Sequence, residues 1–126
     1  MQILNYIPCK TNSTRITGKN IKSYKNKLLV DYTIRFAKQT KNKILLSSEN
    51  EELLKSKSVD FKHLRRGIMK NKNLSNLKVM QHLAKNGFFN NFDYICLLQP
   101  THPLRRLIDY KNIINSAVNI NNTPLV

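Results

Sequence analysis

The chain has 126 residues, in which 22 Lys and Arg face only 7 Asp and Glu, so its formal net charge is +15 and its pI is about 10.1. Hydrophobic residues make up 40% of the chain, which is enough for one packed core and excludes a wholly disordered basic tail. No apolar run approaches the roughly 20 residues that span a bilayer, and the N-terminus lacks the pattern of a signal peptide, so we expect a single cytoplasmic domain.

The first half of the chain alternates short apolar runs with longer helical patterns. Residues Ile3–Ile7 predict a strand that ends at Pro8, and a long polar loop over 9–24 follows it. Apolar residues at helical spacing predict a helix over 28–39 with one face directed at a sheet. A second strand is predicted over 43–47. This order of strand, helix and strand is typical of a βα unit.

The second half continues the alternation. Ser48 and the glutamates behind it predict the N-cap of a short helix that runs to about Lys57, and an extended piece is expected over 59–63. Apolar residues at helical spacing then predict a helix over 74–86. The pair Asn86-Gly87 is expected to end this helix as a C-cap.

A continuous apolar run occupies residues 94–98, with the sequence YICLL. Such a run predicts a strand that is buried on both faces of a parallel sheet. Two prolines break the pattern over 99–106. A final helix is predicted over 108–118, and a strand is expected to start at Thr123. The whole chain therefore predicts an α/β domain with a largely parallel sheet.

Two unusual loops follow predicted strands, one after Pro8 and one over 99–106. Ligands of open α/β sheets bind at the carboxyl ends of the strands, so both loops should face one crevice. The first loop carries Lys10, Arg15 and Lys19 among hydroxyl and amide side chains, a combination that can surround a phosphate. It lacks the glycines of a Walker A or dinucleotide-binding loop. From the residues alone, a solvated surface loop remains the alternative.

The two cysteines, Cys9 and Cys96, are far apart in sequence, and each lies in an apolar segment. This favours reduced, buried thiols over a disulfide or a zinc site. We expect Cys96 in the core. Cys9 adjoins the first loop, and we expect its thiol to be open to modification without a catalytic role.

Two segments resemble the signatures of one enzyme family. Residues 7–21, IPCKTNSTRITGKNI, resemble the signature of acylneuraminate cytidylyltransferases, which is close to IPARGGSKRIPGKNI. Residues 97–105, LLQPTHPLR, resemble LLQPTSPLR of the same family. The segments between these two motifs occur in the same order in this chain as in the family. The resemblance covers essentially the whole chain and implies a three-layer, Rossmann-like nucleotide-diphospho-sugar transferase fold, with residues 1–126 as its N-terminal, CTP-binding part and the C-terminal part truncated.

The resemblance also implies a reaction. In this family a nonulosonic (sialic-type) acid attacks the α-phosphate of CTP through its anomeric hydroxyl, and pyrophosphate leaves. CTP and an acidic nine-carbon sugar are thus the expected partners, with Mg²⁺ or another divalent cation as cofactor, a homodimer as the assembly, and no membrane or nucleic acid. The family's metal-binding carboxylates would lie beyond Val126, so the metal ligands are unknown. The sugar could be neuraminic, pseudaminic, legionaminic or deoxyoctulosonic acid.

Residue roles follow from the matched motifs. The resemblance implies catalytic roles for Lys10 and Lys19. It implies nucleotide binding by Ser13, Arg15, Asn20, Arg65 and Ser75. It implies contacts to the acidic sugar from Gln99, Thr101 and Arg105.

Several positions depart from the family pattern or have a second interpretation. Lys10 replaces an arginine and keeps its charge without the planar fork. His102 replaces a serine, and its role as a ligand or as a spacer stays open. Glu49 is expected to act as a charge at a helix N-terminus rather than on a metal. His82 is expected to be structural, and the sequence identifies no partner for His63.

Two other functions remain open. The chain could be a truncated, inactive paralogue that still binds nucleotide. It could also be a basic nucleic-acid-binding module, because Lys and Arg neutralise phosphates. However, lysines run from Lys10 to Lys111 without a dense block and accompany many Asn and Ile, so a compositional bias explains part of the charge equally well.

Overall fold

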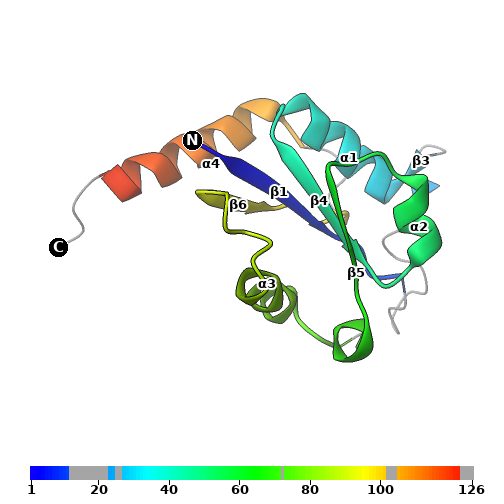
Figure 1. The fold of residues 1–126 in the computed structure, drawn as a ribbon. Coiled ribbons are helices and arrows are strands. Elements are labelled where there is room, and N and C mark those ends of the chain that lie inside the picture. Colours follow the sequence, from blue (N-terminus) through cyan, green and yellow to red (C-terminus); the bar gives the residue numbers. More distant parts are fainter. Residues whose placement is uncertain (12–22, 25–26, 72, 102–104, 123–126) are drawn as a thin grey trace.

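Four parallel strands with helices on both faces make up the fold (Figure 1). The computed structural model describes residues 1–11, 23–24, 27–71, 73–101 and 105–122 of the chain. In chain order the elements are β1 (Ile3–Pro8), β2 (Ser23–Tyr24), β3 (Lys27–Leu28), α1 (Leu29–Gln39), β4 (Lys43–Ser48), α2 (Glu51–Ser56), β5 (Phe61–Leu64), the 3₁₀ helix η2 (Gly67–Lys70), α3 (Asn76–Lys85), β6 (Tyr94–Leu97) and α4 (Leu107–Asn122).

The sheet has the order β5-β4-β1-β6, so β1 and β4 lie in its middle. All three pairings are parallel, which confirms the predicted parallel sheet. β1 is buried along its whole length, and β4 is buried everywhere except at its first residue. Burial on both faces is what helices on the two sides of a parallel sheet produce.

β6 lies at an edge of this sheet, and the prediction that its apolar run is buried on both faces is wrong. In the described part of the chain β6 pairs with β1 alone. Its first three residues are therefore half-buried, and Leu97 is 38% exposed. An apolar run shows that a strand is sheltered, but it does not show how many neighbouring strands it has.

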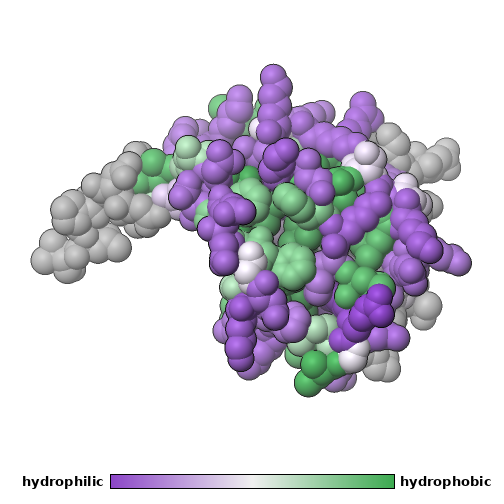
Figure 2. Space-filling model, viewed as in Figure 1, coloured by the Kyte–Doolittle hydropathy of each residue, from purple (hydrophilic) through white to green (hydrophobic). Residues whose placement is uncertain are grey.

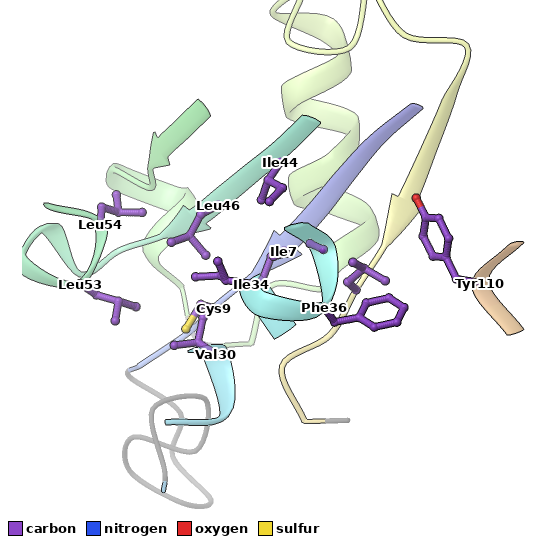
Figure 3. Close-up of a cluster of buried hydrophobic side chains, with 12 residues drawn as sticks. Ile7, Cys9, Val30, Ile34, Phe36, Ile44, Leu46, Leu53, Leu54 and Tyr110 are labelled. Carbon is purple, nitrogen blue, oxygen red and sulfur yellow. The ribbon is translucent and has the colours of Figure 1, made fainter. Parts of the chain in front are cut away.

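Helix α1 covers one face of the sheet. Its buried residues include Val30, Ile34 and Ala37, whose spacing places them on one stripe of the helix, as predicted. Figure 3 shows Ile34 beside Ile7 and Leu46 of the central strands, and Val30 beside Cys9. Helix α2 and the start of α4 add side chains to the same core, so these three helices form one layer.

Helix α3 covers the opposite face. Val79 and Leu83 of this helix pack against Leu4, Tyr6 and Leu45. Because successive side chains of a strand point to opposite faces, alternate residues of β1 and β4 belong to this second core. The three layers, α1 with α2 and α4, then the sheet, then α3, confirm the predicted α/β architecture (Figure 1).

The helix ends agree only in part with the sequence expectations. Asn50, and not Ser48, caps α2: its Oδ1 accepts a hydrogen bond from the backbone N–H of Leu53 at 3.1 Å. The hydroxyl oxygen of Ser48 instead accepts from the N–H of Asn50 at 3.1 Å. The end of α3 is confirmed, because Asn86 is its C-cap and Gly87 follows with a φ of +86° that favours glycine.

Two other segments differ from expectation. The predicted loop over 9–24 ends in a short strand, since Ser23–Tyr24 pairs antiparallel with Lys27–Leu28. Helix α4 continues to Asn122, which is four residues beyond the predicted end at Val118. The strand expected to start at Thr123 lies outside the described residues.

Most of the surface seen in Figure 2 is hydrophilic, and apolar side chains gather near the centre of that view. Phe61 and Phe88 are among the exposed apolar side chains, and they border a hollow of about 560 Å³. Gln2 and Lys43 also line this hollow. It therefore lies at the amino ends of β1 and β4, away from the loops that the sequence assigns to ligands.

Candidate functional site

The carboxyl ends of β1, β4 and β5 bring polar residues together. Lys10 follows β1, Ser47 lies near the end of β4, and Arg65 follows β5 directly. Backbone hydrogen bonds join these ends: the N–H of Cys9 donates to the carbonyl of Ser47 at 2.8 Å, and the N–H of Arg65 to that of Ser48 at 2.9 Å. Since parallel strands all point the same way, this edge is where an α/β sheet binds ligands.

Arg65 is the most buried charged residue of this group, with 1% of its surface exposed. Its Nε–H donates to the hydroxyl of Ser47 at 2.9 Å, and one terminal nitrogen donates to the hydroxyl of Tyr6 at 3.3 Å. The other terminal nitrogen, NH1, is buried without a hydrogen-bond partner in the described part of the chain. A buried donor without an acceptor is unfavourable and is rare in folded proteins.

His63 lies beside this arginine. Its hydrogen-bond partner, which the sequence did not identify, is Ser47. The strand register pairs Ser47 of β4 with His63 of β5, and their Oγ and Nδ1 atoms are 2.8 Å apart. The ring also packs against Phe88 and His82. Burial above all, and then the influence of Arg65 and His82, lowers the pKa of His63 from 6.5 to about 4. His63 is therefore neutral at neutral pH.

This lowered pKa predicts a pH dependence of stability. Between about pH 6.5 and about pH 4 the unfolded chain takes up a proton at position 63 that the folded chain does not, so the free energy of unfolding should fall as the pH is lowered through this window. Above about pH 6.5 the contribution of neutral His63 should be fully present. Melting temperatures measured from pH 7 down to pH 5, where carboxylates stay largely ionised, should fall less steeply in His63→Gln than in the wild type.

His82→Gln is the matched control for this experiment, because His82 is exposed on α3 while its ring lies 6.2 Å from that of His63. We expect it to keep most of the wild-type slope. An identical slope in wild type and His63→Gln would contradict the prediction.

Lys10 and Ser75 meet at the start of α3. The ammonium of Lys10 donates a hydrogen bond to the carbonyl oxygen of Leu74, and the hydroxyl of Ser75 caps α3 by accepting from a backbone N–H of its first turn. Burial and then the nearby Arg65 lower the pKa of Lys10, while Glu49 opposes them. Two cations thus lie close together beside a helix N-terminus, which is an arrangement that attracts anions.

Glu49 holds the beginning of the first loop. One of its carboxylate oxygens accepts hydrogen bonds from the backbone N–H of Thr11, at 2.6 Å, and from the hydroxyl of Thr11. Glu49 precedes the cap residue Asn50, so the expected role as a helix charge is combined with a contact that the sequence did not indicate. Through this contact Glu49, which follows β4, fixes the position of Thr11 in the segment that follows β1.

Gln99 and Arg105, two of the three residues assigned to the sugar, lie together after β6. One terminal nitrogen of Arg105 donates to the carbonyl oxygen of Gln99, and the other donates to the hydroxyl of Thr33 on α1 at 3.3 Å. Burial lowers the pKa of Arg105. Thr101 is half-buried in the turn between them. These contacts attach this group to the α1 side of the sheet, whereas Arg65 contacts Tyr6 on the α3 side.

A hollow of about 450 Å³ opens beside Arg105. Its charged lining residues are Arg105, Arg106 and Asp109; the other lining residues are Phe36, Cys96, Leu97, Leu98, Tyr110 and Ile113. It adjoins the exposed edge of β6 and is large enough for a small ligand.

Other predicted site residues cannot be placed. Ser13, Arg15, Lys19 and Asn20 of the first loop lie outside the described residues, and so does His102 of the second loop. Lys10, Arg65 and Ser75 are thus the members of the predicted catalytic and nucleotide-binding sets that the structure locates, and it brings them together.

Cys9 differs from expectation. Its side chain is fully buried and lies against Val30 and Ile34 in the core (Figure 3). Burial, followed by the charge of Glu49, raises the pKa of its thiol to about 12. The expectation that Cys9 is open to modification is therefore wrong, because the nucleophile that attacks thiol reagents is an accessible thiolate.

We expect native protein to resist alkylation at Cys9. In the Cys96→Ser variant, iodoacetamide at pH 8 should leave the intact mass unchanged over a time that fully modifies the same protein in urea. The control is the Cys9→Ser variant, in which half-buried Cys96 should react at an intermediate rate. Rapid labelling of Cys9 without denaturant would contradict the described packing.

Comparison with known proteins identifies the family. A family profile described as cytidylyltransferase matches residues 6–123. The chain belongs to the cytidylyltransferase family. The match includes the carboxyl end of β1, the first loop, β4, β5 and α3, so it covers the segments that contribute to the site at Lys10 and Arg65. Among curated proteins no sequence matches this chain.

A solved structure has the same fold. It is CMP:2-keto-3-deoxy-manno-octonic acid synthetase complexed with CTP, with a TM-score of 0.76 and 14% sequence identity. The alignment covers 98% of this chain and 50% of that one, so the chain spans about half the length of the synthetase. At this identity the likeness establishes the α/β nucleotidyltransferase fold alone.

Neither a metal site nor a membrane span is found in the part of the chain that the structure describes. No three His, Cys, Asp or Glu side chains gather there in a way that could hold a metal ion. None of the described helices combines the length and apolar character needed to cross a membrane.

Proposed function

We propose that this chain binds CTP and transfers CMP to the anomeric hydroxyl of an acidic sugar. The observation that carries the proposal is the pair of neighbouring cations Lys10 and Arg65, of which Arg65 is buried with NH1 unpaired among the described residues. A triphosphate would provide an anionic acceptor for NH1 of Arg65, and both cations would attract it. The family match and the resemblance of the two loop motifs favour CTP as that triphosphate.

The proposed reaction is a displacement at phosphorus. The oxygen of the anomeric hydroxyl forms a bond to the α-phosphorus of CTP, the bond to the bridging oxygen breaks, and pyrophosphate leaves with that electron pair, while the hydroxyl proton passes to solvent. Lys10 and Lys19 would neutralise charge that develops on the phosphates. The nucleotide would be held by Ser13, Arg15, Asn20, Arg65 and Ser75, and the sugar acid by Gln99, Thr101 and Arg105.

The sugar is proposed to be a 2-keto sugar acid. The motifs resemble those of acylneuraminate cytidylyltransferases, and the solved structure of the same fold is named as a synthetase for 2-keto-3-deoxy-manno-octonic acid. Both sugars carry a carboxylate next to the anomeric carbon, which suits the guanidinium of half-buried Arg105 near the hollow of about 450 Å³. Sialic-type acids are our first choice within this class.

Other expectations stay predictions. They are residues 1–126 as the N-terminal, CTP-binding part of a longer domain, a divalent cation such as Mg²⁺ as cofactor, a homodimer as the assembly, and a cytoplasmic location.

Binding and turnover can be tested separately. A ligand at about 100 times its Kd stabilises a protein by about 2.7 kcal/mol. At equal concentrations we therefore expect CTP, as the tightest-binding nucleotide, to raise the melting temperature more than UTP, ATP or GTP. Lys19→Ala should reduce the CTP shift. Turnover is then followed as pyrophosphate release with CTP, Mg²⁺ and each of four sugar acids: neuraminic, pseudaminic, legionaminic and deoxyoctulosonic.

The outcomes distinguish the candidates. A CTP shift with pyrophosphate release supports the transferase. A CTP shift without release, at high protein concentration and with every sugar, would favour nucleotide binding without turnover, a candidate that the half-length match to the synthetase keeps in view. The absence of a CTP shift, together with tight and steeply salt-dependent binding of DNA or RNA, would overturn the proposal in favour of a nucleic-acid-binding module.

A further inference from the structure

The guanidinium of Arg65 is held on two of its three nitrogens. Nε donates to Ser47 and one terminal nitrogen to Tyr6, while NH1 is buried and has no partner among the residues described. No group that the structure describes forms an ion pair with this side chain. The arrangement leaves one arm of a fixed fork available to an acceptor from outside the protein.

The hydrogens of Ser47 can be assigned from chemistry. Nε of Arg65 can only donate, so the hydroxyl oxygen of Ser47 accepts from it at 2.9 Å. The hydroxyl hydrogen is then free to be donated to Nδ1 of His63, 2.8 Å away. In this arrangement Nδ1 carries a lone pair, and His63 is the neutral tautomer protonated on Nε2.

The surroundings of His63 favour the neutral ring that this arrangement requires. Its ring is buried between Phe88, His82 and the sheet, and the groups that act on it electrostatically are Arg65 and His82. All of them, together with burial, disfavour a charged ring. When Nδ1 of His63 is unprotonated, it accepts the hydroxyl hydrogen of Ser47 and leaves the lone pairs of Ser47 available to Arg65. A ring protonated on Nδ1 would instead donate to Ser47 and compete with Arg65 for these lone pairs.

We propose that Ser47 and His63 are positioning residues for the nucleotide: they fix Arg65 by its Nε edge, so that NH1 is left to donate to an anionic group of the ligand. The proposal rests on the proposed function. It explains why a buried donor stays unpaired in the protein without ligand, since the missing acceptor would come with the nucleotide. Lys10, which lies close enough to Arg65 for its pKa to be lowered, would meet the same anion.

The first test measures the Kd for CTP by calorimetry in three single variants. Ser47→Ala should weaken binding about tenfold, because hydrogen bonds to charged groups are among the stronger ones in proteins. Ser47→Thr keeps the hydroxyl and should restore most of the affinity. Ser48→Ala is the matched control: Ser48 is the buried neighbour whose hydroxyl serves Asn50, and this variant should bind as the wild type does.

A double-mutant cycle separates positioning from general destabilisation. In an Arg65→Met background, adding Ser47→Ala should change the Kd for CTP by less than about twofold, since the residue to be positioned is absent. A loss of the same size in both backgrounds would overturn the proposal, and so would wild-type affinity in Ser47→Ala. If Ser47→Thr does not fold, the double-mutant cycle still tests whether Ser47 acts through Arg65.

A nucleotide-free measurement completes the experiment. The ¹⁵N spectrum of His63 should show an unprotonated Nδ1 at pH 7, and hydrogen exchange at Nε of Arg65 should become faster in Ser47→Ala. A protonated Nδ1 or an unchanged exchange rate would overturn the positioning network even if CTP binds. If both signals behave as expected but the wild type binds no nucleotide, the proposed function fails, and the role of NH1 fails with it.

Discussion

Replacing Arg65 by methionine is expected to weaken CTP binding about 100-fold and to leave the melting temperature unchanged or raised. The side chain is 1% exposed and forms no ion pair in the described part of the chain, so its hydrogen bonds to Ser47 and Tyr6 offset only part of the cost of burying its charge. Methionine has a similar length and a flexible apolar chain that fits such a space. The hydroxyls of Ser47 and Tyr6 each lose a donor, which offsets part of the gain.

The affinity loss has a different origin. In the complex, Arg65 would donate charge-assisted hydrogen bonds to the nucleotide, and removal of such a donor from a buried site costs about 2–5 kcal/mol of binding. Calorimetry with CTP and thermal unfolding without it measure the two effects on the same samples. Stability and affinity should therefore move in different directions.

Arg66→Met is the matched control for this substitution. Arg66 is the next residue in the chain, is exposed, and makes no side-chain cap for η2. It should change neither the Kd for CTP nor the melting temperature appreciably. Wild-type affinity in Arg65→Met would remove Arg65 from the nucleotide site, and a collapse of its melting temperature would make the guanidinium a structural element instead.

The sequence alone does not distinguish these two adjacent arginines by their burial. An Arg-Arg pair after an apolar segment is typical of a solvated surface, and only the motif resemblance selected Arg65. Its burial depends on Tyr6 and Ser47, which lie 59 and 18 positions away in the chain. Local pattern carries no information on such distant neighbours.

His63 shows the same limit from another side. Its strand was predicted roughly, over 59–63, but its contact with Ser47 follows from the parallel register of β4 and β5. Once that register is known, the pairing of a buried serine with a histidine is immediate. The available signal was Ser47, a polar residue near the end of the apolar strand β4, and the strand order was needed to interpret it.

Periodicity was most informative where burial is one-sided. The stripe of α1 and the C-cap of α3 followed from spacing and from Asn86-Gly87, because both depend on neighbours within a few residues. The edge position of β6 could not be predicted, because a strand with one neighbouring strand and a strand with two can have the same apolar sequence pattern. Local determinants were thus predictable, and those set by strand order were not.

Replacing Tyr110 by alanine should destabilise the fold by about 3–5 kcal/mol, which is the second large effect expected. Tyr110 is the buried side chain that anchors α4: its hydroxyl donates to Oδ1 of Asn5 at 2.7 Å and accepts from Nδ2 of Asn42 at 3.1 Å. Its ring packs edge-on against Phe36, with centroids 5.8 Å apart. Alanine removes the ring contacts and leaves the amide of a fully buried Asn5 without its donor.

Tyr110→Phe separates the two contributions, because it keeps the ring and removes only the hydroxyl. We expect it to lose about 1–3 kcal/mol, the penalty of an unsatisfied buried acceptor. Ile113→Ala is the control on the same helix, and since Ile113 is 65% exposed its effect should stay within about 0.5 kcal/mol. Urea unfolding of the three variants gives all values on one scale. Equal losses in Tyr110→Ala and Ile113→Ala would show that α4 is not held through Tyr110, whereas the expected order places its attachment to β1 in one buried polar cluster around Asn5.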